Sequence, residues 1–144
     1  MIYYELKIDS KSSGEIVIND ENIITSAEVM FDTVNNDTRT KSNAILARMT
    51  ICGNIINGKD TSINEQAIKI SEWARDLTNE TTYRNVTLKV KTDAKTVLRI
   101  YKIPDMFVCD YKENFQSADK NDAYTFELKL TQSENKLKDI KVYK

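Results

Sequence analysis

The segment from Gly53 to Lys59 matches the pattern G-x-x-x-x-G-K, in which backbone N–H groups of a glycine-containing loop cradle a phosphate. It stands between an apolar run and a helical pattern, which is the context that such a loop requires. The next residue, however, is Asp60, where a serine or threonine should bind magnesium, and a carboxylate there would repel phosphate. We therefore interpret the segment as an Asn-Gly turn leading into a helix, and we expect no cofactor.

Other catalytic groups are also poorly placed. The chain has no histidine, which excludes histidine-based triads, general bases and zinc sites. Ser-x-x-Lys occurs at Ser117 and at Ser133, but both copies lie in polar segments that could not bury and deprotonate the lysine. Cys52 and Cys109 fall in apolar, strand-like runs, which favours reduced, buried thiols over a disulfide. We expect no catalytic residue, no metal site and no enzymatic activity.

Charge and composition narrow the function classes further. The 144 residues include 21 basic and 22 acidic ones, for a net charge of −1, so nothing indicates a basic footprint for nucleic acid. No apolar run approaches the ~18 residues that span a bilayer, and the start lacks the pattern of a secretory signal. With 40% hydrophobic and 30% charged residues, we expect one soluble domain, residues 1–144, in the cytoplasm.

Most of the chain alternates apolar and polar residues with period two, which predicts half-buried antiparallel strands. The clearest case sets Tyr124, Phe126, Leu128 and Leu130 against polar neighbours. Pro104 separates two runs, because proline suits a strand start or edge. The expected strands are 3–8, 15–18, 23–34, 44–56, 86–91, 95–103, 106–115, 124–131 and 137–143. The fold class is mainly β (α+β): an antiparallel β-barrel or two-sheet sandwich of about 7–9 strands with one helix.

That helix is predicted over residues 63–78, where apolar residues recur at helical spacing. Ser62 and Glu65 have the spacing of a capping box at its start. The apolar stripe should cover one face or an open end of the β structure. The residues that we expect to pack there are Ile63, Ile70, Trp73 and Leu77.

A long polar stretch, Asp32 to Ser42, joins two of the expected strands and has one apolar residue, Val34. It is either a solvated hairpin loop or an extended arm that pairs with a neighbouring subunit. The candidate interface residues in the arm are Asp32, Asn35, Asn36, Asp37, Arg39 and Lys41.

The order of these elements resembles the tube-protein family of contractile injection machines, which includes the hemolysin-coregulated protein of type VI secretion and phage tail-tube proteins. The resemblance lies in the segments SAEVMFDTVNNDTRTKSNAILARMTICG, EQAIKISEWARDL and YTFELKLTQSENKLKDIKVY. It implies a small antiparallel β-barrel or sandwich flanked by one helix, hexameric rings that stack, and no reaction catalysed. The chain also resembles small Gram-positive proteins that are labelled membrane-associated proteases.

We therefore expect a non-catalytic structural subunit that assembles with copies of itself. Its further partners would be other tube, sheath or spike components of a contractile injection or phage-tail-like apparatus. Such an apparatus can be released from the cell. The alternatives are a monomeric binding or adaptor module of the same fold, and a membrane-associated peptidase. Ring formation would join exposed strand edges, for which residues 86–90 and 124–130 are the candidates because they are rich in strong β-formers. In stacked rings the 32–42 arm would order against the next ring.

Overall fold

The computed structural model describes residues 1–9, 14–33, 45–58, 62–93, 95–119, 121–133 and 136–144. It is mostly β structure with one α-helix, so the predicted mainly β (α+β) class is confirmed. The strands are β1 (Tyr3–Ile8), β2 (Ile16–Ile18), β3 (Ile24–Thr33), β4 (Ile45–Asn54), β5 (Arg84–Lys91), β6 (Val97–Gln116), β7 (Ala123–Gln132) and β8 (Lys141–Tyr143). The helix is α1 (Ile63–Ala74), and short 3-10 turns cover Ile55–Asn57 and Leu137–Asp139.

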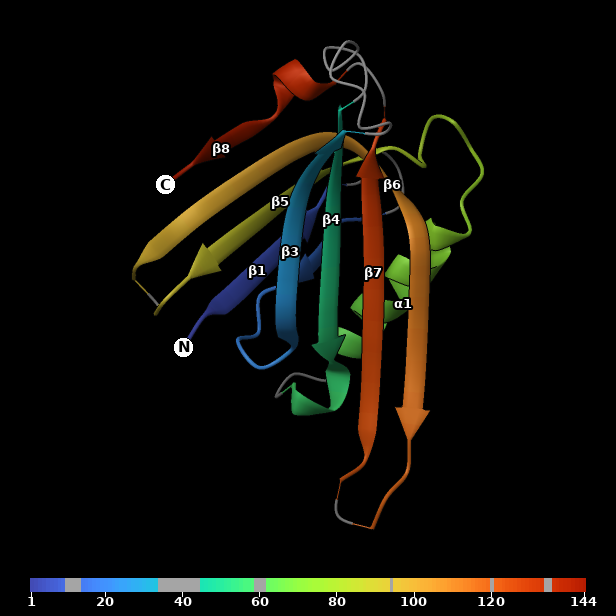
Figure 1. Cartoon of the computed structure of the whole chain (residues 1–144). Helices are drawn as coiled ribbons and strands as arrows, with labels where there is room; N and C mark the ends of the chain where they lie inside the picture. The colour runs from blue at the N-terminus through green and yellow to red at the C-terminus, as the bar shows by residue number, and fades with distance from the viewer. Residues whose placement is uncertain (10–13, 34–44, 59–61, 94, 120, 134–135) are drawn as a thin grey trace.

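All eight strands belong to one antiparallel sheet that folds over into two layers (Figure 1). The strand order is β2-β1-β5-β6-β7-β4-β3, with β8 paired to β6. The first half of β6 pairs with β5 and β8, and its second half pairs with β7. We call β2, β1, β5, β8 and the first half of β6 the back layer, and β3, β4, β7 and the second half of β6 the front layer. The described strands do not close into a barrel, so the two-layer alternative is correct.

Strand β6 is continuous over 20 residues, from Val97 to Gln116, so the predicted division at Pro104 was wrong. Instead of ending a strand, Pro104 and Asp105 form a bulge at which the register against β5 shifts. Asp105 has φ of 53°, a left-handed conformation that Asp tolerates better than most residues. A bulge bends its strand, and here the bend carries the chain from the back layer into the front layer.

The end of β7 and the chain after it hold this bend in place. The buried side chain of Gln132 donates hydrogen bonds of 3.0 Å to the carbonyl oxygens of Pro104 and Lys136. The backbone N–H of Ser133 donates to the carbonyl oxygen of Asp105 at 2.8 Å, and Lys136 pairs with the Asp105 carboxylate at 3.8 Å. Because proline has no backbone N–H to donate to a neighbouring strand, these side-chain and loop hydrogen bonds replace the regular strand pairing at the bend.

The core lies between the two layers and is closed at one side by α1. Alternate residues of the central strands point inward and are buried, as the period-two pattern predicted; examples are Leu6, Leu88 and Leu128. The helix contacts β2 and β6 and contributes buried side chains from one face. The Gln66 side chain accepts a 3.0 Å hydrogen bond from the Val17 N–H, so α1 also covers part of the open edge of β2.

Helix α1 is shorter than predicted. It ends at Ala74, and Leu77 lies beyond it with 93% of its surface exposed, so the expectation that Leu77 packs against the sheet was wrong. The chain turns away because Asp76 accepts hydrogen bonds from the Thr78 N–H and the Thr81 hydroxyl, which form a loop in place of another helical turn. The predicted capping box is also absent, because the Ser62 side chain makes no cap hydrogen bond.

Candidate assembly surfaces

The strands that we expected at the sheet edges are interior strands. β5 lies between β1 and β6, and β7 lies between β6 and β4, so both are paired on each side and residues 86–90 and 124–130 offer no free edge. High β-propensity did not distinguish edge from centre, because the same residues favour both positions. The open edges of the front layer are instead β3 and the second half of β6.

Strand β3 is a long edge that lacks two of the usual protections, lysine and proline, although it has a register shift between Ile24 and Ser26. It is ten residues long, pairs with β4 alone among the described strands, and contains neither lysine nor proline, the residues that commonly block edge-to-edge pairing. Met30 and Phe31 on this strand are 40% and 50% exposed. Of its two carboxylates, Glu28 is exposed, whereas Asp32 is turned toward Arg48 of β4, at 3.9 Å. The edge therefore presents unpaired backbone groups and apolar side chains together.

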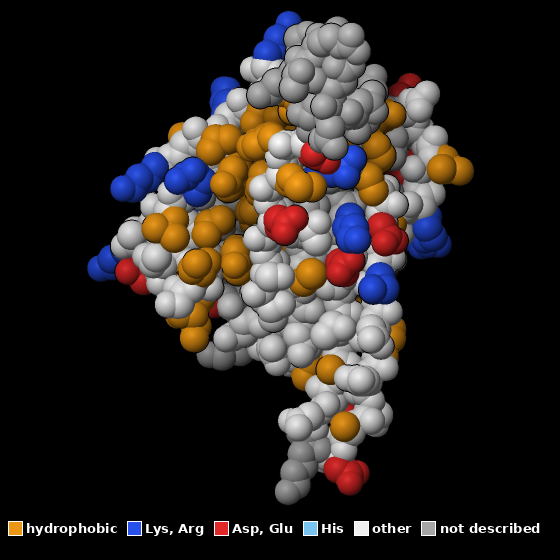
Figure 2. All heavy atoms as spheres, viewed as in Figure 1, with side chains coloured by type: hydrophobic (Ala, Val, Ile, Leu, Met, Phe, Trp, Pro, Cys, Tyr) orange, Lys and Arg blue, Asp and Glu red, His pale blue; other side chains and the backbone are white. Residues whose placement is uncertain are grey.

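An apolar surface continues from β3 onto the back layer. Figure 2 shows hydrophobic side chains gathered on the left of the molecule, next to β3. On the core-facing side, strand register brings together Tyr4 and Val90, and also Tyr101 and Val142, of which Val142 is 43% exposed. Together with Phe31 these four residues make up what we call the apolar shelf. Phe31 and Val142 are exposed, and the other three are partly buried against the core. An apolar patch on the surface of a soluble protein commonly marks an interaction site.

The outward side of the front layer is polar and carries charges of both signs, as Figure 2 shows to the right of the shelf. Two ion pairs lie on this side: the side chains of Arg48 and Asp32 are 3.9 Å apart, and those of Lys129 and Glu127 are 3.4 Å apart, measured from nitrogen to oxygen. The thiol of Cys52 lies 3.9 Å from the Glu127 carboxylate. Cys52 is half-buried and Cys109 is exposed, so the prediction that both thiols are buried was wrong. Both ion pairs are exposed and contribute little to stability individually.

Below this face the β6–β7 hairpin projects beyond the other strands (Figure 1). Near its base, Glu113 accepts hydrogen bonds from the hydroxyls of Tyr111, at 2.6 Å, and Tyr124, at 2.9 Å. Burial and the Glu113 contact raise the pKa of Tyr124 to about 12 and raise that of Tyr111 as well. The Phe115 ring packs on Tyr124 with centroids 4.3 Å apart. These contacts link the two strands of the hairpin where Tyr111 and Tyr124 pack against the edge of the core.

The outward side of the back layer is rich in lysine. Glu5 lies between two of them, with its carboxylate 2.6 Å from Lys91 and 3.6 Å from Lys89. The hydrogen bond from Lys91 holds the pKa of Glu5 below its ordinary value of 4.5. A carboxyl whose folded pKa is depressed stabilises the fold fully above its unfolded pKa, and that contribution disappears as the pH falls through the folded pKa.

We expect Glu5→Gln to lower the free energy of unfolding at pH 7 by up to about 1 kcal/mol, because the two ion pairs are partly exposed. The difference between parent and variant should shrink as the pH falls below 4.5 and approach zero once Glu5 is protonated in the folded protein. Urea unfolding at a series of pH values measures both curves. A difference that persists unchanged into acid would show that Glu5 acts through packing rather than charge.

Comparison with known proteins identifies solved structures that have a similar fold. No family model matches the sequence, and no curated protein matches it by sequence. By structure, the chain is similar to a chain of the extended sheath/tube terminator of the PVC extracellular contractile injection system, at 14% identity and a TM-score of 0.53, covering 96% of this chain and 93% of that one. The chain has the fold of a tube protein.

Two further solved structures have the same fold. A chain of the extended PVC sheath–tube complex is 13% identical with a TM-score of 0.53, covering 96% of this chain and 87% of that one. A crystal structure of an Hcp protein is 10% identical with a TM-score of 0.51, covering 93% and 88%. The resemblance inferred from the order of elements is thereby confirmed at the level of fold.

Within the tube-protein fold, the predicted interface residues can be placed only in part. Asp32 lies one residue before the end of β3 and pairs with Arg48, whereas the other five arm residues lie outside the described residues: Asn35, Asn36, Asp37, Arg39 and Lys41. In the helix, Ile63, Ile70 and Trp73 are buried. The open edge of β3 and the apolar shelf were missed. The exposed apolar pair Met30-Phe31 before a polar stretch was the available signal for them.

In its described part, the segment that matches a phosphate loop consists of the end of β4 and the 3-10 turn Ile55–Asn57. The Ile56 N–H donates to the Asn54 side chain at 3.1 Å, and the Gly58 N–H donates to the Ile55 carbonyl oxygen at 3.1 Å. These two N–H groups therefore form hydrogen bonds within the turn itself. Among the described residues no cluster of three or more metal-ligating side chains occurs, and no described helix combines the length and hydropathy needed to cross a bilayer.

Proposed function

We propose that the protein is a non-catalytic structural subunit that assembles with copies of itself into a ring of a contractile injection or phage-tail-like apparatus. The observation that carries the proposal is the open edge of β3 beside the apolar shelf. The fold, which is that of tube and Hcp proteins, supports it. A second copy seated on this edge would pair the free backbone groups and cover the shelf.

The topology of the front layer allows such a contact to repeat. Its four strands run β6-β7-β4-β3 and every neighbouring pair is antiparallel, so β3 and the second half of β6 run in opposite directions. A copy rotated about an axis roughly parallel to the strands therefore brings its β6 against β3 as another antiparallel neighbour. This contact is heterologous: it joins two different surfaces of neighbouring subunits. It forms a closed ring when a whole number of identical rotations adds up to 360°.

In such a ring the polar outward side of the front layer faces the lumen. The apolar shelf is buried between subunits, and the outward side of the back layer faces away from the ring axis. Six subunits is the number that the resemblance implies. Rings would stack into tubes with the 32–42 arm reaching the next ring, and sheath, cap or spike proteins would be the further partners, in an apparatus that can leave the cell.

Disulfide trapping tests the proposed contact directly. Glu28 of β3 and the residues Lys112, Asn114 and Gln116 of β6 share the outward side of the front layer. In a background with Cys52 and Cys109 replaced by serine, Glu28→Cys combined with cysteine at one of the three β6 positions should give an oxidation ladder ending in a closed ring. Glu28→Cys alone is the control and should stop at dimers. Three pairs that all remain monomeric would contradict the proposed edge and favour the adaptor module.

A further inference from the structure

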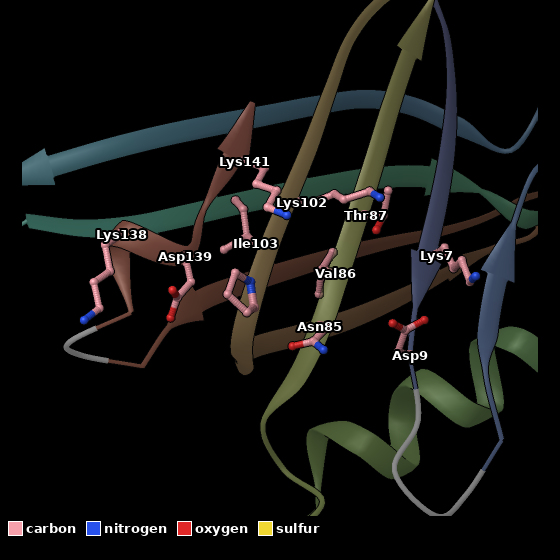
Figure 3. Close-up of a pocket in the computed structure, with 11 residues that line it drawn as sticks. Lys7, Asp9, Asn85, Val86, Thr87, Lys102, Ile103, Lys138, Asp139 and Lys141 are labelled. Carbon is pink, nitrogen blue, oxygen red and sulfur yellow. The ribbon is translucent and has the colours of Figure 1, made fainter. Parts of the chain in front are cut away.

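A hollow of about 600 Å³ opens on the outward side of the back layer, where β1, β5, β6 and β8 meet the turn before β8 (Figure 3). Its floor includes Asn85 and Thr87 of β5. Four lysines and two aspartates line it: Lys7, Lys102, Lys138, Lys141, Asp9 and Asp139. Figure 3 shows Lys102 reaching over β5 toward Thr87, while Lys7 points toward β2, where Glu15 pairs with it at 3.6 Å.

Two of these lysines are in an unfavourable arrangement for the isolated protein. Lys102 of β6 and Lys141 of β8 are direct cross-strand partners, and like charges directly opposite one another destabilise a sheet. Within the described parts of the chain, no carboxylate lies at ion-pair distance from Lys102, Lys138 or Lys141. Lys102 contacts only the Tyr143 ring, 5.7 Å from its centroid, among the interactions of the described residues. A local violation of pairing rules without internal compensation is typical of functional surfaces.

The excess of positive charge extends over the whole outward side of the back layer. Its strand positions carry five lysines against one glutamate, although the chain as a whole has a net charge of −1. The five are Lys7, Lys89, Lys91, Lys102 and Lys141. Glu5 compensates Lys89 and Lys91 at one end of this side, and Glu15 compensates Lys7. The two strand lysines without a described carboxylate at ion-pair distance, Lys102 and Lys141, therefore both lie at the hollow.

We propose that this hollow is a docking site for an acidic segment of a protein partner. Carboxylates spaced along a polypeptide can meet Lys102 and Lys141, while Asn85 and Thr87 on the floor can hydrogen-bond its polar groups. The described lining contains no arginine fork for bidentate phosphate contacts. These features favour a polypeptide over a nucleic acid.

In the proposed ring this hollow would face outward, where a surrounding protein could reach it. The docking site itself does not require the ring, because β1, β5, β6 and β8 of one chain supply it. Binding and assembly are therefore separate measurements, and either can fail without the other.

Fluorescence anisotropy with a labelled ten-residue peptide of alternating Glu and Ser tests the proposal at low salt, with the assembly state followed by light scattering. Lys102→Gln combined with Lys141→Gln should weaken binding about fivefold or more, since each exposed charge pair is worth up to about fivefold. Lys112→Gln combined with Lys129→Gln removes the same charge from the outward side of the front layer and should change the affinity less than twofold. Binding should weaken as salt rises.

Lys141→Glu separates a binding role from a structural one. It replaces a like-charge pair by an opposite-charge pair, so it should raise Tm by about 1–5 °C while weakening peptide binding. A purely structural lysine would not change stability and binding in opposite directions. Absence of peptide binding, equal loss in both double variants, or tighter binding of a ten-nucleotide oligothymidine than of the peptide would each overturn the proposal.

Discussion

Replacing Trp73 by alanine should lower the free energy of unfolding by about 3–5 kcal/mol, the usual cost of removing a large aromatic side chain from a core. Trp73 is 1% exposed at the last turn of α1. Its indole N–H donates a 2.7 Å hydrogen bond to the Thr82 carbonyl oxygen, and the Arg84 guanidinium lies 5.3 Å from the centre of its ring. The side chain thus connects the helix, the following loop and the start of β5.

Leu77→Ala is the matched control on the same apolar stripe of the sequence. Because Leu77 is 93% exposed, its truncation should change the free energy of unfolding by less than about 0.5 kcal/mol. Trp73→Phe should fall between the two, because it keeps most of the apolar volume and loses the hydrogen bond. Urea denaturation followed by circular dichroism gives all three values. Similar losses for Trp73→Ala and Leu77→Ala would show that the helix packs differently from the arrangement described here.

Placing lysine at Phe31 should abolish assembly while leaving the subunit folded. Phe31 lies on the open β3 edge and belongs to the apolar shelf, and half of its surface is exposed. In the proposed ring a lysine there would bury its charge against the neighbouring subunit, and edge lysines are a common device that prevents strand pairing. Light scattering should then show monomers at concentrations where the parent protein forms rings.

Leu98→Lys is the control for the Phe31 variant. Leu98 is 38% exposed and lies on β6 in the back layer, on the outward side that carries Lys102. The substitution makes a similar change in charge and hydrophobicity, but on a surface that would point away from the neighbouring subunit, so rings should persist. If Phe31→Lys assembles as well as Leu98→Lys, β3 is not the contact.

The alternation of apolar residues was sufficient to predict the fold class, the helix and most strands. In β7, for example, Phe126, Leu128 and Leu130 are buried while their neighbours are not. Burial on one side of a sheet imposes this period directly on the sequence. The predicted helix start at Ile63 is correct, although the capping box that helped to predict it is absent.

Features that depend on long-range contacts were not predictable. Pro104 was interpreted as a strand boundary because the hydrogen bonds that make its bulge tolerable come from Gln132, nearly thirty residues later. Leu77 continues the helical spacing, but the local Asp76 hydrogen bonds end the helix first. Edge strands were misassigned because the order β2-β1-β5-β6-β7-β4-β3 is set by tertiary pairing, which propensity does not reveal.

The candidate surfaces were predicted less well than the fold. The front-layer edge and the apolar shelf draw residues from β1, β3, β5, β6 and β8, which are adjacent only after folding. The lysine hollow has the same origin, since Lys102 and Lys141 are brought together by a three-residue strand at the end of the described chain. The overall charge of −1 gave no sign of it.

Native mass spectrometry of the unmodified protein, over a range of concentrations and with negative-stain microscopy of the same samples, tests the central claim most directly. The proposed function predicts one closed oligomer, six subunits by the resemblance, which appears in the micrographs as a ring with a central hole and converts to monomers in the Phe31→Lys variant. Monomers alone at every concentration and salt, with the protein folded, would contradict a ring-forming subunit.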